Sequence, residues 1–216
     1  MPGIKAILFD FDGVIIDSEP VHAKAKRLVL EKFGITYPVN IFDDYKGRTD
    51  KVFFDHVANE LDTGKRPAEI FLDSKNFFFD ELVKEIKLID GFLSFHKSAK
   101  EKGIRTAIVS STTLYSFKPV DEIYKLTDIF DLVITGADTE FHKPHPAPYL
   151  KALERLSVKA SDVIAIEDSP NGIISAKAAG CFVYGLTSSF QGTDLITAGA
   201  DRIVESYEEL ARILEI

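Results

Sequence analysis

A short apolar run near the start of the chain ends in two aspartates and a glycine, and this feature constrains the fold more than any other. Residues 7–9 are apolar, Asp10 and Asp12 follow one residue apart, and Gly13 comes next. Such runs are typical of buried strands. Two carboxylates at a buried strand end are unfavourable unless a positive charge lies between them, and such oxygen ligands suit Mg²⁺. The pattern therefore predicts a magnesium site at the carboxyl end of a strand, where open α/β sheets place their chemistry.

Length and charge limit the class of protein. The chain has 216 residues, 45% of them hydrophobic, which is enough for one domain or for one domain with an insertion. The net charge of −8 gives a field that repels nucleic acid and anionic membranes, so we expect neither as a partner. The same field repels a phosphorylated metabolite, so a phosphate site in this chain needs local positive charge.

Cysteine usage and hydropathy indicate a cytoplasmic protein. Cys181 is the single cysteine, so no internal disulfide can form, and it lies in an apolar stretch typical of a buried structural thiol. The sequence has neither a signal-peptide pattern nor an apolar segment of the roughly 20 residues that a membrane helix needs. The oligomeric state is left open, and a monomer is compatible with the sequence.

Strands and helices alternate regularly from residue 90 onward, which is typical of a parallel sheet covered by helices on both faces. The fold class is therefore α/β, a doubly wound, mostly parallel sheet. Residues 1–16 and 90–216 are expected to form this core, and 17–89 a helical domain inserted after the first strand. Strands are predicted at 4–9, 104–109, 131–135, 163–166, 181–185 and 202–204. Helices are predicted at 20–33, 49–61, 67–86, 91–102, 119–126, 147–156, 172–179 and 207–214.

Three further segments carry residues suited to phosphate chemistry. Ser110 ends one predicted strand, and Ser111 follows it. Lys143 stands between His142 and Pro144. The pair Glu167-Asp168 ends another predicted strand. Taken singly, Ser110 is explained as a helix cap, Lys143 as a surface lysine and the acidic pair as a turn. Together with Asp10 and Asp12, and in this order, they favour a single site.

This order of motifs closely resembles the haloacid dehalogenase superfamily, and the resemblance covers essentially the whole chain. That superfamily combines a D-x-D-G motif, a Ser or Thr at a strand end, a lysine often within K-P-x-P, and an acidic pair followed by Ser-x-x-Gly. The matching residues are Asp10-Phe11-Asp12-Gly13-Val14, Ser110, Lys143-Pro144-His145-Pro146, Glu167-Asp168, Ser169 and Gly172. The resemblance implies a Rossmann-like core with a helical cap. Within the superfamily, Asp17-Ser18-Glu19-Pro20 and the cap are similar to the group of beta-phosphoglucomutases and small sugar-phosphate phosphatases.

The resemblance also implies a role for each residue. Asp10 is the expected nucleophile that forms an aspartyl-phosphate, and Asp12 the acid for the leaving alcohol and then the base for water. Ser110 and Lys143 are expected to bind the transferring phosphoryl group. Gly13 and Ser111 are the neighbouring substrate-binding positions. The cofactor implied is Mg²⁺, held by Asp10, the Asp12 carbonyl and Asp168, with Glu167 as a ligand or a partner of one.

The expected substrate is a small phosphorylated metabolite, which the cap would select. Lys46-Gly47-Arg48 is similar to the specificity loop of the family, and His22 is a further candidate on the first cap helix. We expect a phosphatase, with a beta-phosphoglucomutase-type mutase as the alternative. Two departures argue against the mutase: Asp50 replaces an arginine that holds the second phosphate, and Thr113-Leu114 replace a Lys-Asn pair.

The same residues bear on three other functions. Dehalogenation has no leaving alcohol to protonate, and that branch lacks the second aspartate, which is Asp12 here. A phosphonate hydrolase needs a cap lysine that forms a Schiff base, for which Lys46 and Lys51 are the candidates and an exposed lysine is the simpler explanation. A phosphate-binding or regulatory protein without turnover is the alternative outside enzymes.

Overall fold

The computed structural model describes residues 3–45 and 49–216, and the chain divides into two compact units. Met1–Asp17 and Lys87–Ile216 form an α/β unit, and Ser18–Ile86 form a helical unit. The helical unit is one continuous insertion that follows the first strand of the α/β unit.

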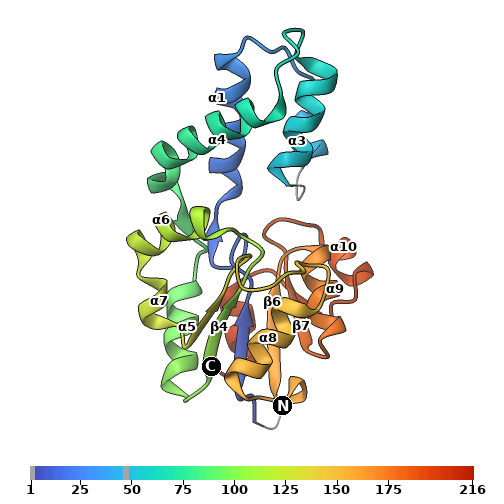
Figure 1. Ribbon diagram of the computed structural model, residues 1–216. Helices are drawn as coiled ribbons and strands as arrows, with labels where there is room; N and C mark the ends of the chain where they lie inside the picture. The colour runs from blue at the N-terminus through green and yellow to red at the C-terminus, as the bar shows by residue number, and fades with distance from the viewer. Residues whose placement is uncertain (1–2, 46–48) are drawn as a thin grey trace. The chain divides into compact units, whose positions relative to one another are not determined.

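A six-stranded parallel sheet forms the centre of the α/β unit (Figure 1). The strand order is β5-β4-β1-β6-β7-β8, and Phe9 at the end of β1 lies beside Ile108 of β4 and Ile166 of β6. The doubly wound α/β fold expected from the sequence is confirmed. The chain proceeds outward from β1 in both directions, so the carboxyl ends of β4, β1 and β6 form a topological switch point, where such sheets bind ligands. The strands span Ala6–Phe9 (β1), Arg105–Val109 (β4), Leu132–Ile134 (β5), Val163–Glu167 (β6), Phe182–Leu186 (β7) and Arg202–Val204 (β8).

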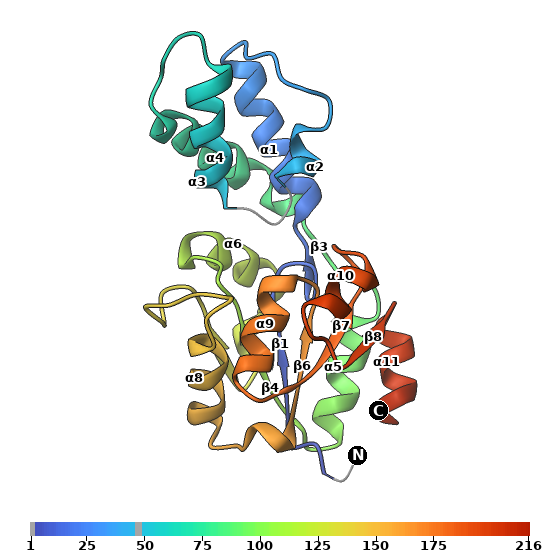
Figure 2. The same cartoon turned by 90° about the vertical axis from the view of Figure 1, so that its right-hand side faces the viewer.

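Helices cover both faces of the sheet because alternate residues of each strand point to opposite faces. Ala6 and Leu8 of β1 pack in a cluster with side chains of α8, α9 and α10. Phe9, on the opposite face, contacts the rings of Phe92 of α5 and Phe130. Figure 2 shows α8 and α9 on one side of the sheet and α5 and α11 on the other. The helices are Phe92–Glu101 (α5), Leu114–Tyr124 (α6), Leu126–Ile129 (α7), Ala147–Leu156 (α8), Pro170–Ala178 (α9), Gly192–Thr197 (α10) and Tyr207–Leu214 (α11), with a 3₁₀ turn at Ala160–Asp162.

The helical unit has an aromatic core of its own. Phe53, Phe54 and Phe71 are fully buried there with Val29. The two long helices α1 and α4 pack on each other, and α3 packs on α4. The elements are Glu19–Lys32 (α1), Ile41–Asp44 (α2), Asp50–His56 (α3), a π-helical segment Val57–Leu61, Ala68–Leu82 (α4) and a 3₁₀ turn Val83–Glu85.

The start of α6 and a short ribbon are two of the local features that differ from the sequence prediction. A helix was predicted from Pro119, but α6 begins at Leu114, because the hydroxyl of Thr113 accepts the backbone N–H of Ser116 and caps the helix there. Pro119 therefore lies inside the helix. A two-residue antiparallel ribbon, β2 (Ile16–Asp17) with β3 (Lys87–Leu88), joins the segments where the chain leaves and re-enters the α/β unit. Pairs this short leave no periodic signal in a sequence.

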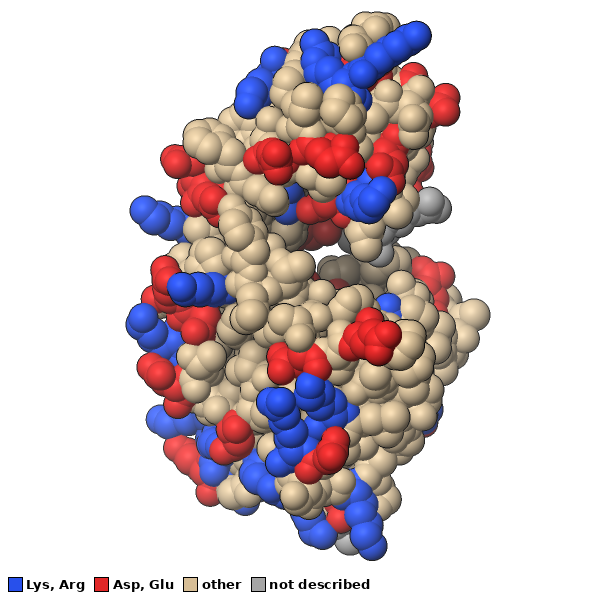
Figure 3. All heavy atoms as spheres, viewed as in Figure 1, with Lys and Arg blue, Asp and Glu red and all other residues tan. Residues whose placement is uncertain are grey.

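The surface carries charges of both signs. On the face of the α/β unit that Figure 3 shows, lysine and arginine side chains are interspersed with aspartate and glutamate side chains. In the part of the chain that the structure describes, every helix is too short or too polar to cross a membrane.

Candidate active site

Three neighbouring strands end in polar residues that were predicted to form a single site. Asp10 follows β1, Ser110 follows β4, and Glu167 is the last residue of β6 with Asp168 next to it. Because β1 lies between β4 and β6, these side chains start from adjacent strands at one edge of the sheet. All four are buried. Buried polar groups are unfavourable unless they have partners, so the contacts among these residues determine what the site can do.

Lys143 connects two of these strand ends. It lies in the loop between β5 and α8, and its Nζ atom is 2.5 Å from Asp10 Oδ1 and 2.6 Å from Glu167 Oε1. Burial by itself lowers the pKa of Lys143, but the attraction of Asp10 and Glu167 outweighs burial and raises it. Lys143 is therefore a fixed positive charge, of the kind that a phosphate site in a chain of net charge −8 requires.

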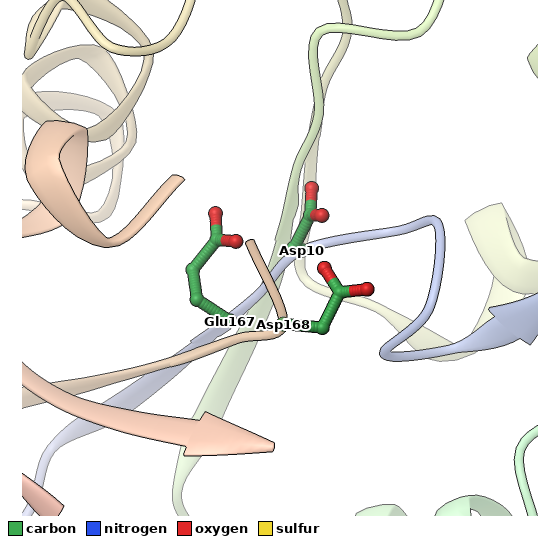
Figure 4. A group of neighbouring side chains, drawn as sticks. All are labelled: Asp10, Glu167 and Asp168. Atoms are coloured by element: carbon green, nitrogen blue, oxygen red, sulfur yellow. The ribbon is translucent and has the colours of Figure 1, made fainter. Parts of the chain in front are cut away.

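Asp10, Glu167 and Asp168 form a buried acidic cluster, and their carboxyl groups project to the same side of the strand ends (Figure 4). One oxygen of each lies within 4.8 Å of the others. Burial is the main cause that raises the pKa of Glu167 to about 7 and the pKa of Asp168 well above its ordinary value, and the charge of Asp10 adds to both shifts. Burial likewise raises the pKa of Asp10, although Lys143 opposes it.

The acidic cluster fits a divalent cation. Three carboxylates face the single ammonium group of Lys143, so the cluster has an excess of negative charge that burial makes unfavourable. A cation with a preference for oxygen ligands would balance that charge.

The loop after β1 brings the backbone of Gly13 against this cluster. Gly13 has a φ of +74°, and a Cβ atom at this position would lie 1.8 Å from Asp168 Oδ2. Its N–H donates to the Ile16 carbonyl at 2.7 Å, and its carbonyl accepts the Ser188 hydroxyl at 2.5 Å. Both the backbone conformation and the close approach require glycine, which explains why this residue follows the two aspartates.

Ser110 and Asp12 are connected through Thr112. The backbone N–H of Thr112 donates to Ser110 Oγ at 2.9 Å, and the Thr112 hydroxyl donates to Asp12 Oδ2 at 2.5 Å. Because the Ser110 oxygen accepts a hydrogen bond, its own proton can be donated to a bound oxyanion.

The remaining predicted substrate-binding residues are Ser111, His22 and the segment 46–48. Ser111 is exposed in the loop after β4. His22 belongs to α1 of the helical unit, where its ring stacks on Phe79 at 4.9 Å, and burial lowers its pKa to about 3. The three residues of the predicted specificity loop lie outside the described residues: Lys46, Gly47 and Arg48.

Asp50, which the sequence analysis set against an arginine of the mutases, pairs with two lysines of the helical unit. Its carboxylate is 3.3 Å from the Nζ of Lys26 and 2.7 Å from the Nζ of Lys75. Burial raises the pKa of Asp50, but the two lysines outweigh burial and lower it. Asp50 is therefore an anion that neutralises buried lysines, the opposite of a phosphate-binding group.

Sequence reasoning missed three residues that contact the site. Thr112 reaches Asp12, Tyr149 of α8 donates to Glu167 Oε1 at 2.6 Å, and the Ser189 hydroxyl bonds Asp168. Thr112 stands within a run of four hydroxyl residues, which was a signal for the loop but not for this contact. Tyr149 and Ser189 carry no local signal, because their contacts depend on how α8 and the loop after β7 pack.

Comparison with known proteins agrees with this geometry. The chain is 32% identical over 222 residues to a phosphorylated carbohydrates phosphatase from Thermotoga maritima, which covers 98% of this chain and 99% of that protein. It is 26% identical to a phosphoglycolate phosphatase from Nitrosospira multiformis over 98% of this chain and 96% of that one. The crystal structure of CbbY from Rhodobacter sphaeroides in complex with phosphate superimposes with a TM-score of 0.80 at 28% identity, over 96% of each chain. A family model described as haloacid dehalogenase-like hydrolase matches residues 7–186, and the chain belongs to that family.

Proposed function

We propose that this protein is a magnesium-dependent phosphatase of small phosphorylated metabolites, such as sugar phosphates, that works through an aspartyl-phosphate. The observation that carries the proposal is the placement of Asp10. Its carboxylate lies at the switch point of the sheet, in contact with Lys143 and within the acidic cluster with Asp168. This arrangement supports the proposal, because attack on a phosphate monoester needs a carboxylate beside a fixed positive charge and a cation site.

In the first step, a carboxylate oxygen of Asp10 attacks phosphorus. An oxygen–phosphorus bond forms as the bond to the leaving alcohol breaks, and the electron pair of the broken bond stays on the leaving oxygen. Asp12 donates a proton to that oxygen. Lys143 and the Ser110 hydroxyl stabilise the negative charge on the phosphoryl oxygens during transfer.

In the second step, water attacks the phosphorus of the aspartyl-phosphate. Asp12, now an anion, takes a proton from the water as the new oxygen–phosphorus bond forms. The bond to Asp10 breaks, and its electron pair restores the Asp10 carboxylate. Inorganic phosphate then leaves, and Asp12 is again protonated for the next cycle.

We assign the cation site to Asp10, Asp168 and the backbone carbonyl of Asp12, with Glu167 next to it. Mg²⁺ bound there would reduce the repulsion between the anionic nucleophile and the anionic phosphate. Glu167 Oε1 accepts hydrogen bonds from both Lys143 and Tyr149. We therefore assign Glu167 mainly to holding Lys143 in position rather than to binding the cation.

The substrate class is supported by the relatives, two of which are named as phosphatases of phosphorylated carbohydrates and of phosphoglycolate. We further propose that residues 17–89 act as a cap that selects the substrate, with His22 and the 46–48 segment as its specificity residues. The pairing of Asp50 with Lys26 and Lys75 supports a phosphatase over a mutase.

The test is phosphate release from a panel of phosphorylated sugars, phosphoglycolate and nucleotides in the presence of Mg²⁺. We expect turnover of at least one panel member, with a loss of about 10³-fold or more in Asp10→Asn. Asp128→Asn, an exposed aspartate on α7, is the matched control and should keep wild-type turnover. No release of phosphate from any member would contradict the proposal and favour a binding protein. Conversion of a sugar 1-phosphate to its 6-phosphate without free phosphate would favour the mutase.

A further inference from the structure

We propose that Thr112 is a positioning residue that orients the Asp12 carboxyl group for proton transfer to the leaving group. This inference rests on the proposed phosphatase function and adds a residue to it. It starts from the hydrogen bond of 2.5 Å that the Thr112 hydroxyl donates to Asp12 Oδ2. The two residues are 100 positions apart and come from the ends of different strands, so the sheet itself brings them together.

The backbone of Thr112 is held on both sides, which fixes where its hydroxyl lies. Its N–H donates to Ser110 Oγ at 2.9 Å, and its carbonyl accepts the N–H of Gly136 at 2.9 Å. Gly136 follows β5, and a Cβ atom there would lie 2.6 Å from the Ser111 carbonyl oxygen. Glycine is therefore needed for the loop after β5 to approach the loop after β4 this closely. Thr112 is thus anchored by residues that follow β4 and β5.

This arrangement has a direct consequence for proton transfer. Donation from Thr112 to Oδ2 restricts the rotation of the Asp12 carboxyl group. That group therefore keeps one orientation toward the leaving oxygen in the first step and toward the attacking water in the second.

Thr112 also orients Ser110. By donating its N–H to Ser110 Oγ, it directs the serine proton away from the loop. One residue therefore aligns a group that binds the phosphoryl oxygens and the group that protonates the leaving oxygen. The backbone contact survives a change of side chain, so substitution of Thr112 separates the two effects.

The leaving group provides the test. An aryl phosphate such as p-nitrophenyl phosphate has a leaving group that departs without protonation, whereas an alkyl phosphate such as a sugar phosphate needs the proton from Asp12. We expect Thr112→Val to lower kcat/KM about 10- to 100-fold for the alkyl substrate and no more than about threefold for the aryl substrate. Thr112→Ser keeps the hydroxyl and should stay within about threefold of wild type on both.

Thr113→Val is the matched control, because it removes the neighbouring hydroxyl that caps α6 and should change both substrates equally. Thermal unfolding of each variant shows that it is folded. Equal losses on both substrates in Thr112→Val, or no loss on either, would overturn the role of Thr112 while leaving the phosphatase proposal intact. A wild-type enzyme that releases phosphate from neither substrate would overturn the proposed function, and the role of Thr112 with it.

Discussion

Tyr149 donates its phenolic proton to Glu167 Oε1 at 2.6 Å, and both residues are fully buried. The ammonium group of Lys143 contacts the same oxygen and lies 5.2 Å from the centre of the tyrosine ring. Glu167 is therefore held from one side while it holds Lys143 from the other. The position of Lys143 thus depends, through Glu167, on a helix residue that the motifs of the sequence do not include.

The first prediction concerns this phenol. Tyr149→Phe leaves Glu167 without one of its donors in a buried site, and we expect the free energy of unfolding to fall by about 1–3 kcal/mol. We also expect kcat for phosphate release to fall by less than about tenfold, because Lys143 keeps its contact with Asp10. Urea unfolding and the phosphate-release assay measure the two effects.

Tyr184→Phe is the matched control for this change. The Tyr184 hydroxyl is also buried, but it has no hydrogen-bond partner among the described residues. Its removal should leave stability unchanged or raise it, because a buried hydroxyl without a partner is unfavourable. Equal destabilisation by the two substitutions would show that the Tyr149–Glu167 bond adds nothing to stability.

Much of the site was predictable, because a polar residue directly after an apolar run marks the end of a buried strand. Asp10, Ser110 and the pair Glu167-Asp168 each follow an apolar run, and a parallel sheet brings the carboxyl ends of such runs to one edge. Lys143 was assigned through the family's K-P-x-P pattern, and its contacts with Asp10 and Glu167 agree with that assignment. These assignments need only local pattern and strand order.

The contacts between elements could not be predicted in this way. Thr112 reaches Asp12, and Ser189 reaches Asp168, only because particular loops fold against each other, and no periodicity reports such packing. The start of α6 was missed for a related reason: a proline usually marks the start of a helix, but the cap at Thr113 comes earlier. Short elements such as β2 and α10 depend on tertiary contacts rather than on their own pattern.

The second prediction uses two glycines with the same positive φ angle. Gly13 and Gly103 both have a φ of +74°, but a Cβ atom at Gly103 would have nothing within 4 Å, whereas one at Gly13 would collide with Asp168. Gly103→Ala should cost about 1–2 kcal/mol of stability from the backbone alone and keep activity. Gly13→Ala should cost more and lower phosphate release at least about tenfold, because Asp168 must move. Equal activity of the two variants would show that the close approach of Gly13 to Asp168 has no role.

The third prediction concerns the cation. Burial and the charges of Asp10 and Glu167 raise the pKa of Asp168, so its ionised form is unfavourable until a cation binds. Asp168→Asn replaces the carboxyl group with a neutral amide in a side chain of the same size. Without Mg²⁺ the variant should therefore unfold at the same temperature as wild type or a higher one. Added Mg²⁺ should raise the unfolding temperature of wild type, because a ligand stabilises the state that binds it, and should leave the variant unchanged.

Asp128→Asn serves again as the control, since this exposed aspartate on α7 is not part of the acidic cluster. Its unfolding temperature should rise with Mg²⁺ as in wild type. A rise of the same size in Asp168→Asn would place the cation elsewhere. Treatment with EDTA should abolish phosphate release by wild type, and added Mg²⁺ should restore it.

The fourth prediction is that His96 makes stability depend on pH. The ring is buried against Phe92 and Phe130, with one nitrogen 3.0 Å from Thr106 Oγ1. Burial, and then the charge of Lys100, lower its pKa from 6.5 to about 4, while Asp131 acts in the opposite direction. The folded state thus binds a proton less readily than the unfolded chain. The contribution of His96 to stability is therefore complete above about pH 6.5 and is lost as the pH falls toward 4.

The variant His96→Gln keeps a polar group that does not titrate, so it lacks this contribution. Carboxylates that titrate in the same pH range affect both proteins equally, and their effect cancels when the two proteins are compared. Between about pH 7 and pH 5, the free energy of unfolding of wild type should fall by about 1–2 kcal/mol relative to the variant, as measured by urea unfolding. Parallel curves for the two proteins would show that His96 titrates normally in the folded state.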